Sequence, residues 1–316
     1  MKSVFIHDLA YQLGDQRISI EDSAKAGRLF TDFQQFAEAG FAFHRMCSPD
    51  KNAYDLAVGA VKQIQPALNG VNSIIYATCL PLNGNIGSFS KFKESRDVKY
   101  LMDYPASHLQ ADFGLENAAV LGLNQQACTS MLGSLRLARA LILSETDQNK
   151  ILCVTADRFP EGASYEQAYN VISDGAAACV VSNEEKGYRL IATHALTNGA
   201  LAQANDDETV GSYFSYTHRL LTELFEKSNL KIEDIDWIIP QNTNVNAWVI
   251  LSRLLGTEFE KVYFKSIKEV GHIISSDNIV NLCKIEEDKL VKPGQKLLLF
   301  MAGFGLNWQA VILEKV

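Results

Sequence analysis

A cysteine at the start of a long apolar helix is the residue in this sequence most suited to chemistry. Cys128 lies in the segment GLNQQACTSMLGSLRLAR, where an apolar stretch ends and a helix-forming run begins. A thiol there lies near unpaired backbone N–H groups and the positive end of the helix dipole, which lower its pKa and favour the nucleophilic thiolate. Its neighbours are small and leave room for a substrate: Ala127, Thr129, Ser130 and Gly133. We therefore expect a nucleophile, with an inert buried cysteine as the alternative.

The composition is that of an ordinary folded protein and excludes several other classes. The chain has 316 residues, of which 47% are apolar and 21% charged, with a net charge of −8. These values exclude disorder, collagen-like repeats and a disulfide-stapled miniature. The acidic balance argues against a nucleic-acid partner. The sequence contains no run of about 18 apolar residues, so no membrane span is expected.

Cysteine usage indicates a reducing compartment and no metal site. The six cysteines, at positions 47, 79, 128, 153, 179 and 283, form no CxxC motif or other zinc-ligand spacing. The first residues lack the basic and apolar regions of a secretory signal. We therefore expect reduced and mostly buried thiols in a cytoplasmic protein without a bound metal.

Strands and helices alternate along the chain, which predicts an α/β fold with helices covering a sheet. Apolar runs flanked by turn residues predict seven buried strands, over residues 3–6, 73–78, 151–156, 176–182, 237–240, 296–301 and 309–313. Apolar residues at helical spacing predict four helices, over residues 20–39, 131–144, 217–228 and 278–287. The helix over 131–144 would hold Cys128 at its beginning.

The strand patterns repeat, which indicates a duplicated unit. The segment NSIIYATCL near residue 73 has the same form as DWIIPQNTN near residue 236, a buried strand that ends in a small polar turn. Each is followed by a pair of strands, KILCVTADRF with GAAACVVS and KLLLFMAGFG with NWQAVILE. This self-similarity predicts two similar halves divided near residues 184–187.

The order of these segments resembles 3-oxoacyl-ACP synthase III, a family of the thiolase superfamily. The resemblance runs over nearly the whole chain, through QQACTSMLGSLRLARALI, VISDGAAACVVS, IEDIDWIIPQNTN, VGHIISSDN and KPGQKLLLFMAGFGLNWQAVIL. It implies a five-layered αβαβα thiolase-like fold from two halves, residues 1–184 with the nucleophile and residues 185–316 with the other catalytic groups. It also implies a homodimer, and Cys128 matches the acyl-accepting nucleophile of the family.

Two positions depart from the family, whose synthases pair the cysteine with a histidine and an asparagine. The family histidine lies in a Pro-His-Gln-Ala-Asn segment, whereas here Gln241 follows the proline. The family asparagine follows a glycine, whereas here His272 follows it. In the condensing enzymes this His and Asn stabilise the enolate that forms as CO2 leaves a malonyl group. Gln241 can donate a hydrogen bond but cannot carry a positive charge.

His272 has the chemistry of a general base and then a general acid near neutral pH. It would take a proton from Cys128 or from an acceptor hydroxyl or amine, and Asp277, five residues further on, would orient it. This Cys-His-Asp set resembles that of polyketide-pathway relatives that load an acyl starter or transfer an acyl group to a hydroxyl. A purely structural His272, and Asp277 as the N-cap of the following helix, are the alternatives.

The resemblance also implies supporting positions. The backbone N–H groups of Cys128 and Gly305 would form the oxyanion hole for a tetrahedral intermediate, although Gly305 also suits a tight turn. Asn244 would order the loop that contains Gln241. Asn246 occupies the position of a family arginine that contacts phosphate, which leaves open how a carrier docks.

These expectations together describe a thioester-dependent acyltransferase with no permanently bound cofactor. Acyl-CoA or an acyl-phosphopantetheine carrier would acylate Cys128. The acyl group would then pass to a small-molecule or carrier-bound acceptor in fatty-acid, polyketide or other secondary metabolism. Two alternatives stay open: a decarboxylating condensing synthase that uses His272 and Gln241, and a non-catalytic subunit of a heterodimeric synthase.

Overall fold

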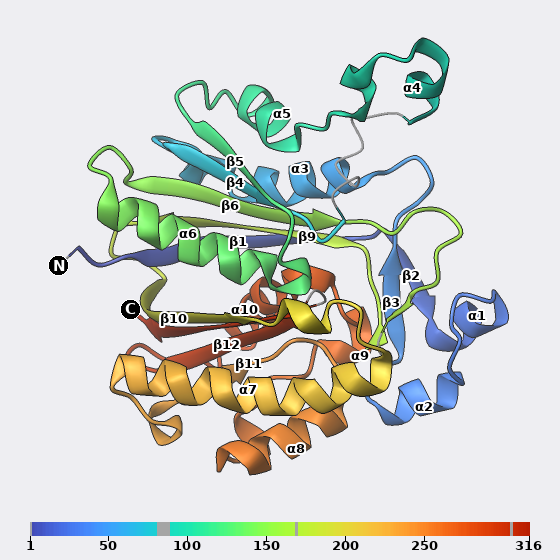
Figure 1. The fold of residues 1–316 in the computed structure, drawn as a ribbon. Helices are drawn as coiled ribbons and strands as arrows, with labels where there is room; N and C mark the ends of the chain where they lie inside the picture. Colours follow the sequence, from blue (N-terminus) through green and yellow to red (C-terminus); the bar gives the residue numbers. More distant parts are fainter. Residues whose placement is uncertain (1, 81–88, 168–169, 304–305) are drawn as a thin grey trace.

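Five layers of helices and strands stack on one another in this protein (Figure 1). The structure is a computed structural model that describes residues 2–80, 89–167, 170–303 and 306–316. Helices α6 (Ser130–Ser144) and α10 (Asp277–Glu287) lie between the two halves of a mixed sheet. The outer layers contain α3 (Ala53–Gln63) on one side and α7 (Asp206–Ser228) and α8 (Val245–Leu255) on the other. The predicted αβαβα architecture is therefore confirmed.

The sheet has the strand order β11-β12-β13-β10-β1-β9-β6-β4-β5, and its two halves are built alike. In one half β4, β5 and β6 run parallel, and antiparallel ladders add β9 and β1. In the other half β11 and β12 run parallel, and antiparallel ladders add β13 and β10. All seven predicted strands are present, and β5 and β10 complete the sheet. The bounds are β1 Phe5–Leu13, β4 Ser73–Ala77, β5 Ala119–Leu123, β6 Lys150–Asp157, β9 Gly175–Ser182, β10 Tyr188–Thr197, β11 Trp237–Ile239, β12 Lys296–Gly303 and β13 Asn307–Lys315.

Two helix predictions need correction at their boundaries. The single helix predicted over residues 20–39 is wrong, because α1 (Ile20–Lys25) and α2 (Phe33–Glu38) replace it. Gly27 follows the end of α1 and has a φ of +69°. This left-handed backbone conformation is incompatible with a right-handed helix, so the helix cannot continue through it. In contrast, α7 begins eleven residues earlier than predicted, because Asn205 and Glu208 form a capping box at its start.

Smaller elements surround the sheet and complete the chain. They are β2 Gln16–Ser19, β3 Phe43–Met46, α4 Phe89–Ser95, α5 Pro105–Asp112, β7 Glu166–Gln167, β8 Asn170–Val171 and α9 Ile267–Val270. The predicted division after residue 184 falls in the connection between β9 and β10 and remains a prediction. In the part of the chain that the structure describes, no helix is both long and apolar enough to cross a lipid bilayer.

The two middle helices begin next to each other, and this meeting point is where the candidate site lies. A 3₁₀ turn, Ala127–Thr129, precedes α6, and a second one, Ile274–Ser276, precedes α10. The two turns contact each other, and the first also packs against β12. Residues that are far apart in the sequence, one set from each half, therefore face a common space.

Candidate active site

Cys128 lies in the tight turn before α6, and the end of β12 packs against its backbone. Its side chain is buried, with 3% of the residue exposed. Ala127 has a φ of +44°, which is a strained value for a residue with a side chain. The backbone therefore changes direction immediately before Cys128. A Cβ placed on Gly303 would lie 2.9 Å from the backbone nitrogen of Cys128. The end of β12 therefore presses directly against the backbone of the candidate nucleophile, and only glycine fits there.

The structure brings Cys128, His272 and Asp277 together in one hydrogen-bonded row. Nε2 of His272 lies 3.4 Å from Sγ of Cys128, and Nδ1 of His272 lies 2.5 Å from a carboxylate oxygen of Asp277. His272 is buried, and its backbone N–H donates to the carbonyl of Val171. Gly271 has a φ of +60°, and a Cβ at this position would lie 2.8 Å from the carbonyl oxygen of Val171, so only glycine fits. Gly271 thus lets the chain turn His272 toward the cysteine.

Asp277 is the first residue of α10, and its carboxylate binds groups that lie outside that helix. One oxygen accepts from Nδ1–H of His272 and from the backbone N–H of Asn242, at 2.7 Å. The other oxygen accepts from the backbone N–H of Ile273, at 2.6 Å. Ser276 occupies the N-cap position, so Asp277 as a simple N-cap is excluded. Because a carboxylate only accepts hydrogen bonds, Nδ1 of His272 carries the proton and Nε2 has its lone pair free.

Gln241 completes the row in the position where the family has its histidine. Its side-chain oxygen accepts the backbone N–H of Ala302 at 2.9 Å, and this bond fixes which way the amide points. The amide nitrogen consequently faces Nε2 of His272 at 3.4 Å. Two donors, the Gln241 amide and the Cys128 thiol, therefore converge on the same imidazole lone pair.

The expectation that the helix N-terminus lowers the pKa of Cys128 is wrong for this structure. The Cys79 thiol lies within hydrogen-bonding reach of the Cys128 thiol, and this contact, together with burial, raises the pKa of Cys128 well above its usual value. The nearby carboxylates of Asp277 and Asp157 act in the same direction. The resting form is therefore a neutral thiol, and a base must remove its proton during the reaction.

Sequence reasoning missed a second buried carboxylate beside the site. Asp157, at the end of β6, accepts hydrogen bonds from the hydroxyl of Thr78 at 2.7 Å, the backbone N–H of Cys79 at 2.8 Å and the hydroxyl of Ser275 at 3.1 Å. It thus ties the loop that carries Cys79 to the turn before Asp277. Burial raises the pKa of Asp157 to about 6. No motif predicted it, because its partners come from two parts of the chain, residues 78–79 and Ser275, that are both distant from it in the sequence.

A cavity of about 360 Å³ opens onto Cys128 and His272. Asn244, predicted to order its loop, lines this cavity and caps α8, since its side chain accepts the backbone N–H of Asn246. Apolar side chains make up much of the remaining wall: Tyr213, Phe214, Ala247, Ile250, Leu306 and Trp308. Gly305, the other predicted oxyanion donor, lies outside the described residues. Among the described residues, no cluster of three or more His, Cys, Asp or Glu side chains could hold a metal ion.

Two family models match this chain. The model for 3-oxoacyl-[acyl-carrier-protein] synthase III matches residues 124–199, and the model for the C-terminal part of the same enzyme matches residues 225–315. Among curated proteins, a beta-ketoacyl-[acyl-carrier-protein] synthase III from Clostridium perfringens is 25% identical over 301 residues, covering 85% of this chain and 87% of that protein. The matched regions contain Cys128, Gln241, His272 and Asp277.

Solved structures share the fold over nearly the full length. A structure titled ChlB3 acyltransferase has a TM-score of 0.83 and 17% identity, covering 99% of this chain and 98% of that one. A 3-oxoacyl-(acyl-carrier-protein) synthase III has a TM-score of 0.81 and 19% identity, covering 99% of both chains. The two family matches together span more than half of the chain, which therefore belongs to the 3-oxoacyl-ACP synthase III family. Membership supports an acyl-transferring or condensing enzyme.

Proposed function

We propose that the protein is an acyltransferase that forms an acyl-Cys128 intermediate from a thioester donor. The observation that carries this proposal is the unbroken row from the Cys128 sulfur through His272 to the buried Asp277. A nucleophile, a base and an orienting carboxylate in this order have the geometry of a catalytic triad. The cavity next to them supplies room for the acyl group and its carrier arm.

The first half of the reaction loads the acyl group onto sulfur. His272 Nε2 takes the proton of the Cys128 thiol as the sulfur attacks the thioester carbonyl carbon. Asp277 stabilises the imidazolium that results. As the tetrahedral intermediate collapses, the carbon–sulfur bond to the donor breaks, and His272 returns the proton to the departing thiolate. The backbone N–H of Cys128 and the amide of Gln241 are suited to stabilise the negative oxygen of the intermediate.

The second half transfers the acyl group to an acceptor. His272, neutral again, takes the proton of an acceptor hydroxyl or amine, which attacks the acyl-Cys128 carbonyl. The thiolate of Cys128 leaves and recovers the proton from the imidazolium. The high pKa of Cys128 makes this thiolate a poor leaving group unless the proton is supplied, so the same base serves both halves.

The test is direct. Incubation with acetyl-CoA and with acetyl-pantetheine should add one acetyl group to the Cys128 peptide, as seen by mass spectrometry. The His272→Ala variant should acylate far more slowly, whereas His218→Ala, which alters an exposed histidine on α7, should acylate normally. No adduct from any donor would contradict the proposal and favour a non-catalytic subunit.

A decarboxylating condensation is the second candidate, and one observation favours it. Gln241 and His272 both line the cavity that contains Cys128, so the Gln241 amide and the His272 imidazole, once Nε2 carries a proton, form a pair of donors able to bind a malonyl thioester carbonyl. Release of CO2 from a malonyl carrier by the acylated enzyme would support condensation. Acyl transfer to water-soluble hydroxyl or amine acceptors without CO2 release would support the first candidate.

We further propose a cytoplasmic homodimer that pairs through β5. This strand is the last one at its edge of the described sheet, and its Val120 and Leu121 are 38% and 37% exposed. An apolar edge strand with unpaired backbone groups is suited to pairing with another strand. The Leu121→Lys variant should sediment as a monomer while the wild type sediments as a dimer; a wild-type monomer would contradict the proposal.

A further inference from the structure

Three polar atoms in the wall of the active-site cavity have no hydrogen-bond partner among the described residues. They are the hydroxyl of Tyr213 on α7, the hydroxyl of Thr243 just before α8, and Nε1 of Trp308 on β13. All three residues line the cavity that contains Cys128. Thr243 and Trp308 are 8% and 1% exposed. Because buried polar groups are nearly always hydrogen-bonded, these atoms are suited to bind a polar group of a substrate.

The hydroxyls of Tyr213 and Thr243 are neighbours. Burial raises the pKa of Tyr213, and the nearby hydroxyl of Thr243 opposes this rise. The two hydroxyls nevertheless make no hydrogen bond of normal geometry with each other. A ligand hydroxyl held between them can accept from one and donate to the other, and Trp308 can add a second donor. Thr243 stands where the family segment Pro-His-Gln-Ala-Asn has its alanine, so that segment has no such hydroxyl.

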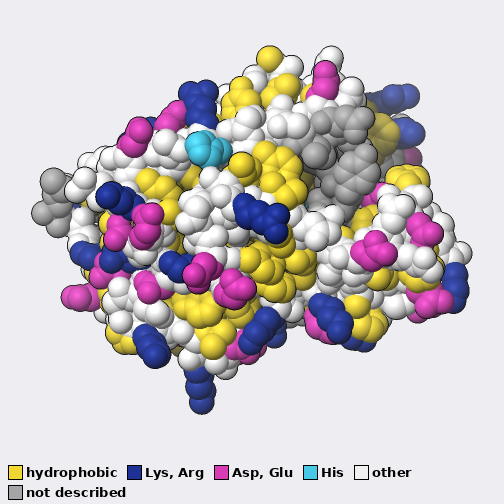
Figure 2. Space-filling view, turned by 90° about the horizontal axis from the view of Figure 1, so that it is seen from below, with side chains coloured by type: hydrophobic (Ala, Val, Ile, Leu, Met, Phe, Trp, Pro, Cys, Tyr) yellow, Lys and Arg dark blue, Asp and Glu magenta, His cyan; other side chains and the backbone are white. Residues whose placement is uncertain are grey.

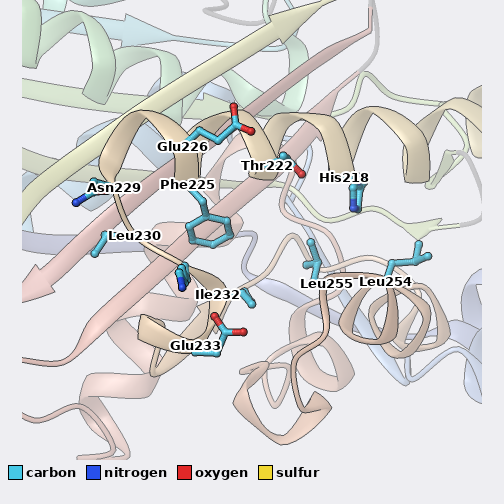
Figure 3. A pocket seen from close by; sticks show the side chains of 11 residues that line it. His218, Thr222, Phe225, Glu226, Asn229, Leu230, Ile232, Glu233, Leu254 and Leu255 are labelled. Atoms are coloured by element: carbon cyan, nitrogen blue, oxygen red, sulfur yellow. The ribbon is translucent and has the colours of Figure 1, made fainter.

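The other polar side chains in the described lining of the cavity are also uncharged, apart from the titratable Cys128 and His272. They are Gln241, Gln167, Asn170, Thr209, Asn244 and Asn246. In contrast, charged side chains of both signs are scattered over the surface on this side of the molecule (Figure 2). The groove of about 380 Å³ between α7 and α8 is likewise lined by charged residues, namely Glu226, Lys231 and Glu233 (Figure 3). The cavity therefore suits an uncharged polar group better than a phosphate or a carboxylate, which arginine and lysine usually bind.

The unpartnered atoms lie near the base of the catalytic row. Thr243 is two residues from Gln241, whose amide faces Nε2 of His272 at 3.4 Å. Trp308 pairs with Ala302 across the β12–β13 ladder, and the backbone N–H of Ala302 donates to Gln241 at 2.9 Å. An acceptor must give its proton to His272, so its remaining groups lie on this side of the cavity, whereas the acyl group is attached to the sulfur.

We propose that Tyr213, Thr243 and Trp308 bind a second hydroxyl of the acceptor, so that the acyl group passes to an uncharged, polyhydroxylated small molecule. This inference rests on the proposed function, since it names the acceptor class of that same site. One acceptor hydroxyl gives its proton to His272 as its oxygen attacks the carbonyl carbon of acyl-Cys128. A carbon–oxygen bond forms, the carbon–sulfur bond breaks, and the thiolate takes the proton from the imidazolium. The second hydroxyl stays intact and holds the first in position for attack.

The test compares acceptors that differ by one hydroxyl. Enzyme acetylated by acetyl-pantetheine is mixed with 1-butanol or with 1,2-, 1,3- or 1,4-butanediol, and the ester product is measured. For the wild type, kcat/KM with at least one diol should exceed that with 1-butanol at least about tenfold, because a site built to bind a hydroxyl discriminates against an analogue that lacks it. The three diols place the second hydroxyl at different distances from the first, so the preferred diol also reports the span of the site.

Two variants, Thr243→Val and Tyr213→Phe, each remove one hydroxyl and nearly keep the shape of the side chain. Each should lower the diol-to-butanol ratio of kcat/KM at least about threefold, because one hydrogen bond to the acceptor is lost. The ratio compares two acceptors in the same enzyme, so a general loss of activity cancels. Tyr76→Phe and Ser252→Ala are the matched controls, and they should leave the ratio unchanged. Their hydroxyls are also buried and unpartnered, but neither is among the described residues that line the cavity.

Urea unfolding separates substrate binding from a structural role. The hydroxyls of Thr243 and Tyr213 have no partner in the described protein to lose. Thr243→Val and Tyr213→Phe should therefore unfold at the same urea concentration as the wild type or at a higher one. A lower midpoint in either variant would show that its hydroxyl is bonded within the protein, and would overturn the proposal.

The failure of this proposal is distinguishable from failure of the proposed function. A wild type that forms acetyl-Cys128 but transfers the acetyl group to none of the alcohols, or to 1-butanol and the diols alike, refutes the acceptor site alone. The same holds if the two variants slow acetylation by acetyl-pantetheine and leave the ratio unchanged, because the hydroxyls then bind the donor. A wild type that no thioester acetylates refutes acyl transfer through Cys128, and the acceptor proposal falls with it.

Discussion

Replacing Asp277 with asparagine tests whether the row of residues is a catalytic device or only a packed core. The carboxylate accepts three hydrogen bonds, from His272, Asn242 and Ile273. The asparagine oxygen can keep the bonds to His272 and Asn242, and its NH2 group then faces the backbone N–H of Ile273. The Ile273 N–H loses its acceptor and the new NH2 group has none there, so two buried donors are unpaired, each at a cost of about 1–3 kcal/mol of stability. The tautomer of His272 is retained, but the negative charge beside it is gone.

The loss of that charge sets the kinetic effect. When Nε2 takes the thiol proton, the imidazolium and the Asp277 carboxylate have charge centres about 4 Å apart, where opposite charges attract by about 4 kcal/mol at an effective dielectric constant of 20. Losing this attraction slows acylation of Cys128 by about 10³-fold, since 1.36 kcal/mol is a factor of ten. Single-turnover acylation by acetyl-pantetheine at pH 7, quenched and weighed by mass spectrometry, measures the rate.

The pH dependence and a control variant complete this experiment. The deficit of Asp277→Asn should narrow only at pH values well above the usual cysteine pKa, because the raised pKa of Cys128 delays formation of the thiolate by hydroxide. Asp174→Asn removes another buried carboxylate, one that accepts from the backbone of Cys47 and Phe159 and from the hydroxyl of Tyr165. It should lose stability but acylate at the wild-type rate. A folded Asp277→Asn that acylates within about threefold of wild type would refute the base assignment.

Three further changes test the surroundings of the site. Burial raises the pKa of Asp157 to about 6 from 3.8, so the folded chain keeps a proton that the unfolded chain has lost between these values. The free energy of unfolding therefore falls as the pH rises through this window. The stability of Asp157→Asn relative to the wild type, measured by urea unfolding, should rise by about 3 kcal/mol from pH 3 to pH 7 and then stay constant. Gly303→Ala should displace the backbone of Cys128 and slow acylation by about 10²-fold, as single-turnover rates would show. Cys79→Ala removes the thiol contact that raises the pKa of Cys128, so iodoacetamide should alkylate Cys128 at lower pH; an unchanged pH profile would contradict the assigned cause.

The sheet could be predicted from the sequence because its strands are buried on both faces and read as continuous apolar runs. The helices were harder to delimit, since their ends depend on single residues. Gly27 splits the predicted helix over residues 20–39, and the pairing of Asn205 with Glu208 extends α7. Both features are visible in the sequence, but their effect depends on the backbone conformation that tertiary packing allows.

The candidate site was predictable in part, for a definite physical reason. Cys128 was marked by its own surroundings, a helix start among small residues. His272 and Asp277 were found only through the resemblance to a family, because nothing local indicates that their loop returns to the cysteine. The direction predicted for the pKa of Cys128 is wrong, because the helix start is local in the sequence, whereas Cys79 comes from the loop after β4 and Asp157 from the end of β6.

The meeting of the two middle helices explains why the site combines a buried thiol with a distant base. The thiol comes from the turn before α6 in one half, and the imidazole and carboxylate come from the loop before α10 in the other. The turns before α6 and α10 are thereby in contact, one contributing the thiol and the other leading to the carboxylate. Because burial keeps Cys128 protonated, it is protected from adventitious electrophiles, and reactivity depends on His272 at 3.4 Å. The thiol therefore reacts only where both sides of the sheet are packed together and bring His272 within reach of Cys128.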